Sequence, residues 1–248
     1  MKRPAKVLVA AAAALLLSPA FATAAEWSCR SGSGQATLLE LYTSQGCSSC
    51  PPADRWLSEI RNRDDLWTGV VPVAWHVTYW DYIGWRDPFA KPENDRRQRA
   101  TARAARSQVY TPGLFANREE YRQWRRLPPG GSTDSPLEVG VLSARGKGRE
   151  ITVQFTPDPG IVLENPRVEL TYLRSGQHTL VDAGENTGRR LRNDFVAGKL
   201  VSAPLTPGDS GWSARLRLAP EAASEAVALW VLDANDNVLQ ATGTWVQQ

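Results

Sequence analysis

The stretch that decides the fold is Leu38-Leu39-Glu40-Leu41-Tyr42-Thr43-Ser44-Gln45-Gly46-Cys47-Ser48-Ser49-Cys50-Pro51-Pro52-Ala53-Asp54. An apolar strand leads into a Cys-x-x-Cys turn, and the turn leads into a helix whose first turn tolerates proline. The unpaired N–H groups and positive dipole at the start of a helix stabilise a thiolate on the first sulfur. The stretch therefore predicts a redox centre in which Cys47 attacks and Cys50 resolves the mixed disulfide.

Two other interpretations of the cysteine pair are a structural disulfide and half of a metal site. A disulfide that closes so small a loop removes little entropy from the unfolded chain, so it contributes little to stability. A structural zinc site needs two further ligands in a second cluster, and the chain offers only Cys29, His76 and His178, which are scattered along it. The redox pair is the preferred interpretation.

Residues 1–25 have the pattern of an export signal. A basic start precedes an apolar run over residues 7–17, and small residues before position 25 offer cleavage sites. The apolar run is too short to span a bilayer. We expect a periplasmic or secreted protein in an oxidising compartment, with no stable membrane insertion.

The net charge of +3 comes from the three basic residues of this signal, because 26 Lys and Arg then remain against 26 Asp and Glu. A near-neutral mature chain gives no reason to expect a nucleic acid partner. One local excess remains, a set of nine arginines between Arg96 and Arg126. We interpret it as a solvated helix face, and the alternative is an acidic partner or an anionic ligand.

Residues 26–127 alternate apolar strands with helices. The pattern predicts strands at 37–43 and 70–77, helices at 52–62 and 92–108, and a short apolar segment at 113–116. This order, with Thr111-Pro112 before the last segment, is that of a thioredoxin fold. In such α/β sheets the site lies at the carboxyl ends of the strands, so we expect an α/β thioredoxin-like N-terminal domain with its site there.

Residues 128–135 are predicted to be a linker, and residues 136–248 an all-β sandwich-like C-terminal domain. Beyond the linker the helical pattern stops, and short strands alternate with Gly, Pro and Asn turns. The predicted strands are 137–144, 150–156, 166–174, 195–205, 212–218, 226–232 and 238–245.

Four further residues complete the predicted site. Pro112 is expected to be a cis-proline facing the cysteine pair, with Thr111 presenting backbone groups to a substrate strand. His76, near the end of the central strand, could tune the thiolate, shuttle a proton, bind a metal or simply be a core histidine. Asp54, one turn after Cys50, could assist proton transfer or stabilise the helix N-terminus.

Other features have weaker interpretations. The aromatic loop 79–85 is expected to pack against the second domain, because a soluble protein rarely leaves such a patch exposed. Gly184-Glu185-Asn186 is expected to be a turn, and His178 a surface residue. Cys29 is the odd thiol and could be free, paired between chains, or able to exchange with the pair.

Several long motifs resemble the domain-of-unknown-function 1223 family of secreted thioredoxin-like proteins. They are residues 40–54, quoted above, together with His76-Val77-Thr78-Tyr79-Trp80-Asp81-Tyr82-Ile83-Gly84-Trp85-Arg86-Asp87-Pro88-Phe89, Val109-Tyr110-Thr111-Pro112 and Gly184-Glu185-Asn186-Thr187-Gly188-Arg189. The resemblance implies a thioredoxin-like half, a β-rich extension and an exported location, while the family's biochemical role is unassigned. After Thr111-Pro112 such proteins usually have a longer strand ending in Asn-Gly, whereas this chain runs from Asn117 through Arg118 into Glu119.

The leading hypothesis is an exported thiol–disulfide oxidoreductase that needs no organic cofactor and acts on protein thiols or disulfides in the envelope. One alternative is a periplasmic copper-binding chaperone with Cys47, Cys50 and His76 as ligands. Another is a non-catalytic envelope interaction module that binds through its β-rich half. The direction of the redox chemistry and the oligomeric state stay open.

Overall fold

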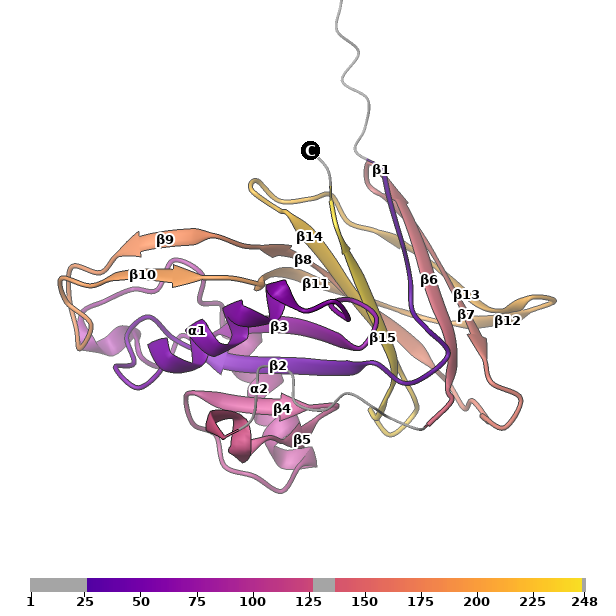
Figure 1. The fold of residues 1–248 in the computed structure, drawn as a ribbon, viewed down its shortest axis with the longest axis horizontal. Helices are drawn as coiled ribbons and strands as arrows, with labels where there is room; N and C mark the ends of the chain where they lie inside the picture. The colour runs from indigo at the N-terminus through magenta and orange to yellow at the C-terminus, as the bar shows by residue number, and fades with distance from the viewer. Residues whose placement is uncertain (1–25, 127–136, 247–248) are drawn as a thin grey trace, which may run out of the picture.

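The computed structural model describes residues 26–126 and 137–246, so the predicted export signal 1–25 and linker 128–135 lie outside the described residues. The described chain is a mixed α/β structure made mostly of strands, with two α-helices. Its strands form a mixed sheet of eight, an antiparallel sheet of five and a two-stranded hairpin (Figure 1). The predicted α/β character of the first part and the strand-rich character of the second are both present.

The eight-stranded sheet carries the cysteine site. In spatial order its strands are β15 (Val238–Trp245), β14 (Ala226–Leu232), β8 (Arg167–Arg174), β11 (Val196–Pro204), β3 (Val70–His76), β2 (Thr37–Thr43), β4 (Gly113–Ala116) and β5 (Glu119–Glu120). The central strands β11, β3 and β2 are parallel, and the remaining neighbours pair antiparallel. Every residue of β3 is buried, as expected for a central parallel strand.

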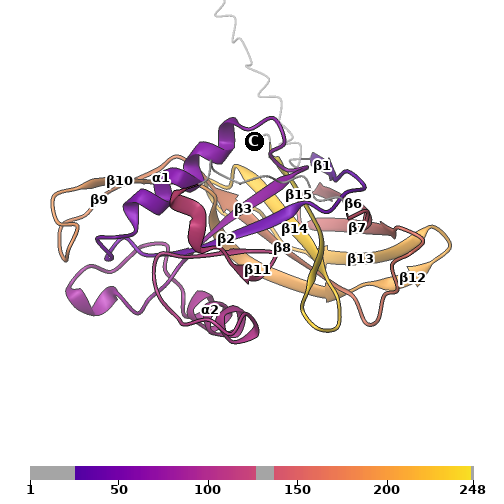
Figure 2. The ribbon, with the colours of Figure 1, turned by 60° about the horizontal axis from the view of Figure 1, so that its bottom comes forward.

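The two α-helices cover opposite sides of this sheet (Figures 1 and 2). Helix α1 (Pro51–Glu59) connects β2 to β3 and continues as a 3-10 turn, η1 (Ile60–Asn62). Helix α2 (Pro92–Ala104) connects β3 to β4 and ends before the predicted residue 108, because the chain turns at Arg106, whose φ is +52°. Two further 3-10 turns are η2 (Asp81–Ile83) and η3 (Arg122–Arg125).

The five-stranded sheet forms a second layer. Its spatial order is β1 (Glu26–Arg30), β6 (Gly140–Lys147), β7 (Glu150–Pro157), β13 (Gly211–Arg217) and β12 (Thr206–Gly208). Strand β1 was not predicted; it pairs with β6, so the first described residues belong to the sheet of the C-terminal half. The hairpin of β9 (Gln177–Leu180) and β10 (Arg190–Asn193) was not predicted either.

The eight-stranded sheet runs across the predicted domain boundary. Strands β8, β11, β14 and β15 all follow the linker in sequence, yet β11 pairs directly with β3. Strand β14 is buried on both faces: Ala226, Ala228 and Trp230 join the core around the helices, whereas Val227 and Leu229 join the core between the two sheets. The fully apolar sequence of β14 reflects this double burial, a pattern that a one-sided sandwich strand does not require.

Arg97 of α2 ties the two halves together. Its guanidinium contacts carboxylate oxygens of Glu40 on β2 and Glu169 on β8, at 2.7 and 2.8 Å. It also stacks near the rings of Trp75 and Trp230, 4.7 and 5.2 Å from their centroids. Because these groups are buried, each charge is stabilised only by its oppositely charged partners. These ion pairs connect α2 to strands from both sides of the linker.

No helix among residues 26–126 and 137–246 is long and apolar enough to cross a membrane.

Candidate active site

The cysteine pair sits where β2 ends and α1 begins. The amide of Cys47 donates to the carbonyl of Ser44 at 3.2 Å, and the amide of Cys50 donates to the carbonyl of Cys47 at 3.2 Å, which closes the tight loop. The carbonyl of Cys50 then accepts from Ala53 and Asp54, so Cys50 caps the helix. Both cysteines are free thiols with no exposed surface in this structure.

The sulfur of Cys47 faces Ser49 and Thr111. The hydroxyl of Ser49 lies 3.2 Å from Sγ of Cys47, and the carbonyl oxygen of Thr111 lies 3.9 Å from it. The Thr111–Pro112 peptide bond is cis, as expected from the sequence. The structure therefore brings Thr111 and Pro112 to the cysteine pair, although 60 residues or more separate them in the chain.

The pKa values of the two thiols are shifted in opposite directions. Hydrogen bonding from the Cys50 thiol, supported by Ser49 and Thr111, lowers the pKa of Cys47 to about 6, although burial acts in the opposite direction. Burial raises the pKa of Cys50 well above its ordinary value, and its hydrogen bond to Cys47 and the nearby Asp54 raise it further. Cys47 is thus a thiolate at neutral pH, and Cys50 keeps its proton.

The structure does not place unpaired amides of the helix beside the Cys47 sulfur, in contrast to the expectation from the sequence. The first two helical residues, Pro51 and Pro52, have no N–H, and the amide of Ala53 is bonded to Cys50 at 2.8 Å. The hydroxyl and amide of Ser49 take their place beside the sulfur.

His76 and Asp54 lie in a buried ionisable cluster behind the pair. Nδ1 of His76 lies 2.7 Å from Oδ2 of Asp87, and both side chains are fully enclosed. Burial by itself would lower the pKa of His76, but the Asp87 carboxylate outweighs this effect, so the pKa of His76 is raised. The charge and hydrogen bond of His76 in turn lower the pKa of Asp87, although burial acts in the opposite direction. Nε2 of His76 has no hydrogen-bond partner among the described residues.

Asp54 is a second buried ionisable group of this cluster, and its pKa lies near neutral pH. Its carboxylate accepts a hydrogen bond from the hydroxyl of Thr43 at 2.9 Å. Burial raises the pKa of Asp54 to about 7, although His76 acts in the opposite direction. The charge of Asp54 in turn raises the pKa of Cys50, so the two groups are electrostatically linked.

No three His, Cys, Asp or Glu side chains in the described part of the chain are grouped so that they could hold a metal ion. His76 uses one ring nitrogen on Asp87 instead. The copper alternative stays a prediction without geometric support.

The aromatic loop packs over the site. The indole N–H of Trp80 donates to the hydroxyl of Thr111 at 2.7 Å, and that of Trp85 donates to the side chain of Gln45 at 3.2 Å. Tyr82 remains 82 % exposed. The expected contact with the C-terminal half exists, but the β9–β10 hairpin makes it: a Cβ on Gly184 would lie 2.9 Å from Ile83 and 3.5 Å from Trp85.

The tip of this hairpin is a part of the site that the sequence did not predict. The side-chain amide of Asn186, which is fully buried, donates to the carbonyls of Gln45 and Cys47 at 2.8 and 3.0 Å. The carboxylate of Glu185 accepts from the amide of Ser48 at 2.9 Å. The motif at residues 184–189 was visible in the sequence, but only as a turn. His178, on the same hairpin, is exposed as expected.

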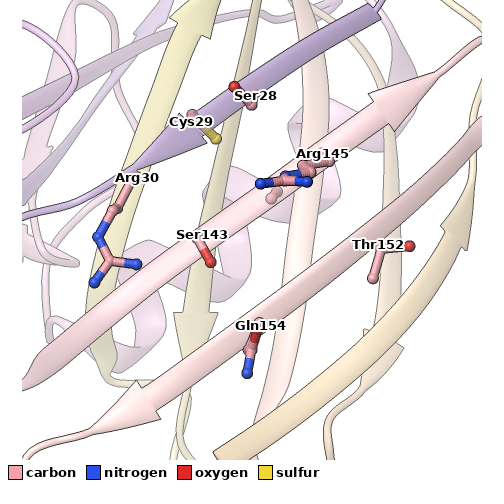
Figure 3. Close-up of a pocket in the computed structure, with 8 residues that line it drawn as sticks. Ser28, Cys29, Arg30, Ser143, Arg145, Thr152 and Gln154 are labelled. Atoms are coloured by element: carbon pink, nitrogen blue, oxygen red, sulfur yellow. The ribbon is translucent and has the colours of Figure 1, made fainter. Parts of the chain in front are cut away.

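Cys29 lies on β1, in the five-stranded sheet rather than in the sheet of the pair. It lines a hollow of about 690 Å³ on that sheet, together with polar residues of β1, β6 and β7 (Figure 3). Burial raises the pKa of its thiol to about 12, which disfavours its thiolate at neutral pH.

The fold and the site define a two-sheet α/β protein with an asymmetric Cys-x-x-Cys pair at the carboxyl end of a central parallel strand. The chain belongs to the family of proteins of unknown function DUF1223, whose model matches residues 38–232. No protein of curated function matches the chain.

Two solved structures share the fold. The crystal structure of protein AGR_C_4864 from Agrobacterium tumefaciens has a TM-score of 0.62 and 24 % sequence identity; the alignment covers 86 % of this chain and 94 % of that chain. The structure of HBP35 of Porphyromonas gingivalis has a TM-score of 0.58 and 13 % identity, covering 86 % of this chain and 76 % of that chain. At these identities the likeness concerns the fold alone.

Proposed function

We propose that this protein is an exported thiol–disulfide oxidoreductase with a thioredoxin-like centre built from β2, α1, β3, α2 and β4. The observation that carries the proposal is the asymmetric geometry of the pair: Sγ of Cys47 faces Ser49 and the cis Thr111–Pro112 segment, whereas Cys50 is buried at the start of α1. The pKa of Cys47, lowered to about 6, and the raised pKa of Cys50 agree with this difference. A structural disulfide needs no such difference between its thiols, but a nucleophile and a resolving thiol do.

The chemistry follows from this asymmetry. The Cys47 thiolate attacks one sulfur of a substrate disulfide, forms a mixed disulfide and releases one substrate thiolate. Cys50 then loses its proton, attacks Sγ of Cys47 and releases the second substrate thiolate, so two electrons pass from the protein dithiol to the substrate. The reverse sequence oxidises a substrate dithiol. Renewed turnover requires an external dithiol or disulfide of the same chemical class.

Asp54 is proposed as the group that receives the Cys50 proton. It is buried, it follows Cys50 by one helical turn, and its pKa of about 7 lets it accept and return a proton near neutral pH. Thr111 is proposed to hold the substrate beside Cys47 through its backbone carbonyl, and Pro112 to shape the segment that presents it. His76, already bound to Asp87, is proposed as a positioning residue for this cluster.

The proposed setting is the periplasm or the extracellular space, where disulfides persist, and the proposed partners are protein thiols or disulfides. N-terminal sequencing of the mature protein from a cell envelope or medium fraction checks the setting. A mature chain that begins before residue 20 would contradict it.

Redox titration tests the function directly. In the Cys29→Ser variant, which removes the odd thiol, we expect Cys47 and Cys50 to form one disulfide whose potential against glutathione lies above about −300 mV. The Cys50→Ala variant should accumulate mixed disulfides on Cys47, and Cys47→Ser should accumulate none. A lower potential, or the absence of trapped adducts, would contradict the proposal.

A further inference from the structure

A groove lies beside the cysteine pair, on the side of β4 and β5. Its volume is about 330 Å³, and its wall is formed by Ser49, the segment 110–112 and three residues of η3, namely Arg122, Trp124 and Arg125. Two of these residues, Ser49 and Thr111, contact Sγ of Cys47, so the groove lies directly beside that sulfur. The β9–β10 hairpin forms a separate two-stranded sheet, drawn across β2 and β3 from β4 and β5 in Figure 1, and none of its residues lines the groove.

The groove carries a net positive charge. Glu120 is the carboxylate beside it, and both of its oxygens are already bound, one by the hydroxyl of Tyr110 at 2.6 Å and the other by Arg122 at 2.8 Å. The side chain of Arg122 is nevertheless 71 % exposed. Arg125 is exposed and stacks on Trp124, 4.7 Å from the ring centroid, and no carboxylate of the described residues pairs with it.

The two arginines are held in place relative to Cys47. Trp124 is 92 % buried and packs against Trp56 of α1, with ring centroids 5.9 Å apart; Tyr121 packs on the same ring at 6.1 Å. Helix α1 begins next to Cys50. The η3 turn is therefore anchored to the active-site helix, so its positive charges are preorganised beside the thiolate.

We propose that the substrate is an acidic polypeptide segment, which lies in this groove with carboxylates next to its reacting cysteine and directed at Arg122 and Arg125. The proposal rests on the proposed thiol–disulfide exchange and names its substrate class. Guanidinium groups bind carboxylates through paired hydrogen bonds, so the two arginines favour carboxylates in the groove.

The test uses three short synthetic peptides as their symmetric disulfides, identical except for Glu, Gln or Lys on both sides of the cysteine. The rate of oxidation of the reduced Cys29→Ser protein is measured with each. Every rate is divided by the rate of the same peptide with dithiothreitol, which is uncharged, so that the peptide's intrinsic reactivity cancels. At low ionic strength we expect the Glu peptide to react on the order of tenfold faster than the Lys peptide, and added salt to reduce this ratio.

Paired variants locate the effect. The double variant Arg122→Gln/Arg125→Gln should lower the Glu-to-Lys ratio at least about threefold. The matched control Arg99→Gln/Arg103→Gln removes the same charge from the exposed face of α2 and should leave the ratio unchanged. Equal rates for all peptides, or a ratio that survives in the groove variant, would overturn the acidic substrate while leaving the exchange chemistry in place. If no peptide reacts with Cys47, the proposed function itself fails.

Discussion

The side-chain amide of Asn186 donates to the backbone carbonyl of Cys47 at 3.0 Å, across 139 residues of sequence. A second bond from the same amide reaches Gln45, and the guanidinium of Arg189 donates to Oδ1 of Asn186 at 2.6 Å. The hairpin tip is thus built into the loop that carries Cys47. The C-terminal half supplies part of the site rather than only a platform for it.

Replacing Asn186 by Ala should destabilise the protein by about 2 kcal/mol, because two buried carbonyls lose their donor. Urea unfolding measures the change. His178→Ala, at an exposed position on the same hairpin, is the control and should stay within about 0.5 kcal/mol of wild type. Equal stabilities for the two variants would show that the Asn186 bonds contribute nothing net.

The reactivity of Cys47 should follow its lowered pKa. In the reduced Cys29→Ser protein, the rate of alkylation of Cys47 by iodoacetamide should rise with pH around a midpoint of about 6. Replacing Cys50 by Ala removes the largest stabilising hydrogen bond to the thiolate, so the midpoint should rise by about one unit. Mass spectrometry of the alkylated peptide gives both curves. An unchanged midpoint in Cys50→Ala would remove Cys50 from the thiolate's environment.

Replacing Asp54 by Asn should stabilise the protein most at alkaline pH. The folded pKa of Asp54 is raised from 3.8 to about 7, so the folded state keeps a proton that the unfolded chain has lost. Wild-type stability therefore falls as pH rises from about 4 to 7, and the Asn variant escapes this loss. Its advantage should grow by roughly 2–3 kcal/mol between about pH 5 and pH 8.5.

Denaturant unfolding at the two pH values checks the sign, and an advantage that shrinks with pH would contradict it. If Asp54 also receives the Cys50 proton, the same variant should release substrate from the Cys47 mixed disulfide more slowly at neutral pH.

Replacing Arg97 by Gln should destabilise the protein by about 3–5 kcal/mol, because Glu40 and Glu169 would keep buried charges without a partner. Arg99→Gln, on the exposed face of the same helix, should have almost no effect. Because the partners of Arg97 lie on strands from both sides of the linker, both halves should unfold in one transition. Two separate transitions in the wild-type protein would show that the halves fold independently.

Local patterns in the sequence predicted several strands of the eight-stranded sheet and the helix after the cysteines well. The strand 37–43 and the hairpin strands 226–232 and 238–245 have the predicted bounds, and the Cys-x-x-Cys turn leads into a helix. These features are local, because side-chain periodicity, proline positions and turn residues act over a few neighbours. The predicted helix at 92–108 was too long, since only backbone conformation at Arg106 ends it.

The sequence by itself determined which reactive groups the site contains: two thiols separated by two residues, a Thr-Pro dipeptide before a short strand, and a carboxylate one turn after Cys50. The tertiary structure alone decided which distant groups adjust that chemistry. Asp87 contacts the ring of His76, and the side chain of Asn186 binds the backbone of Cys47. Strand β11 pairs with β3, because the pairing of strands remote in sequence is set by burial and register across the whole sheet. No local pattern records which strand lies next to which, so these contacts appear only when both cores are formed together.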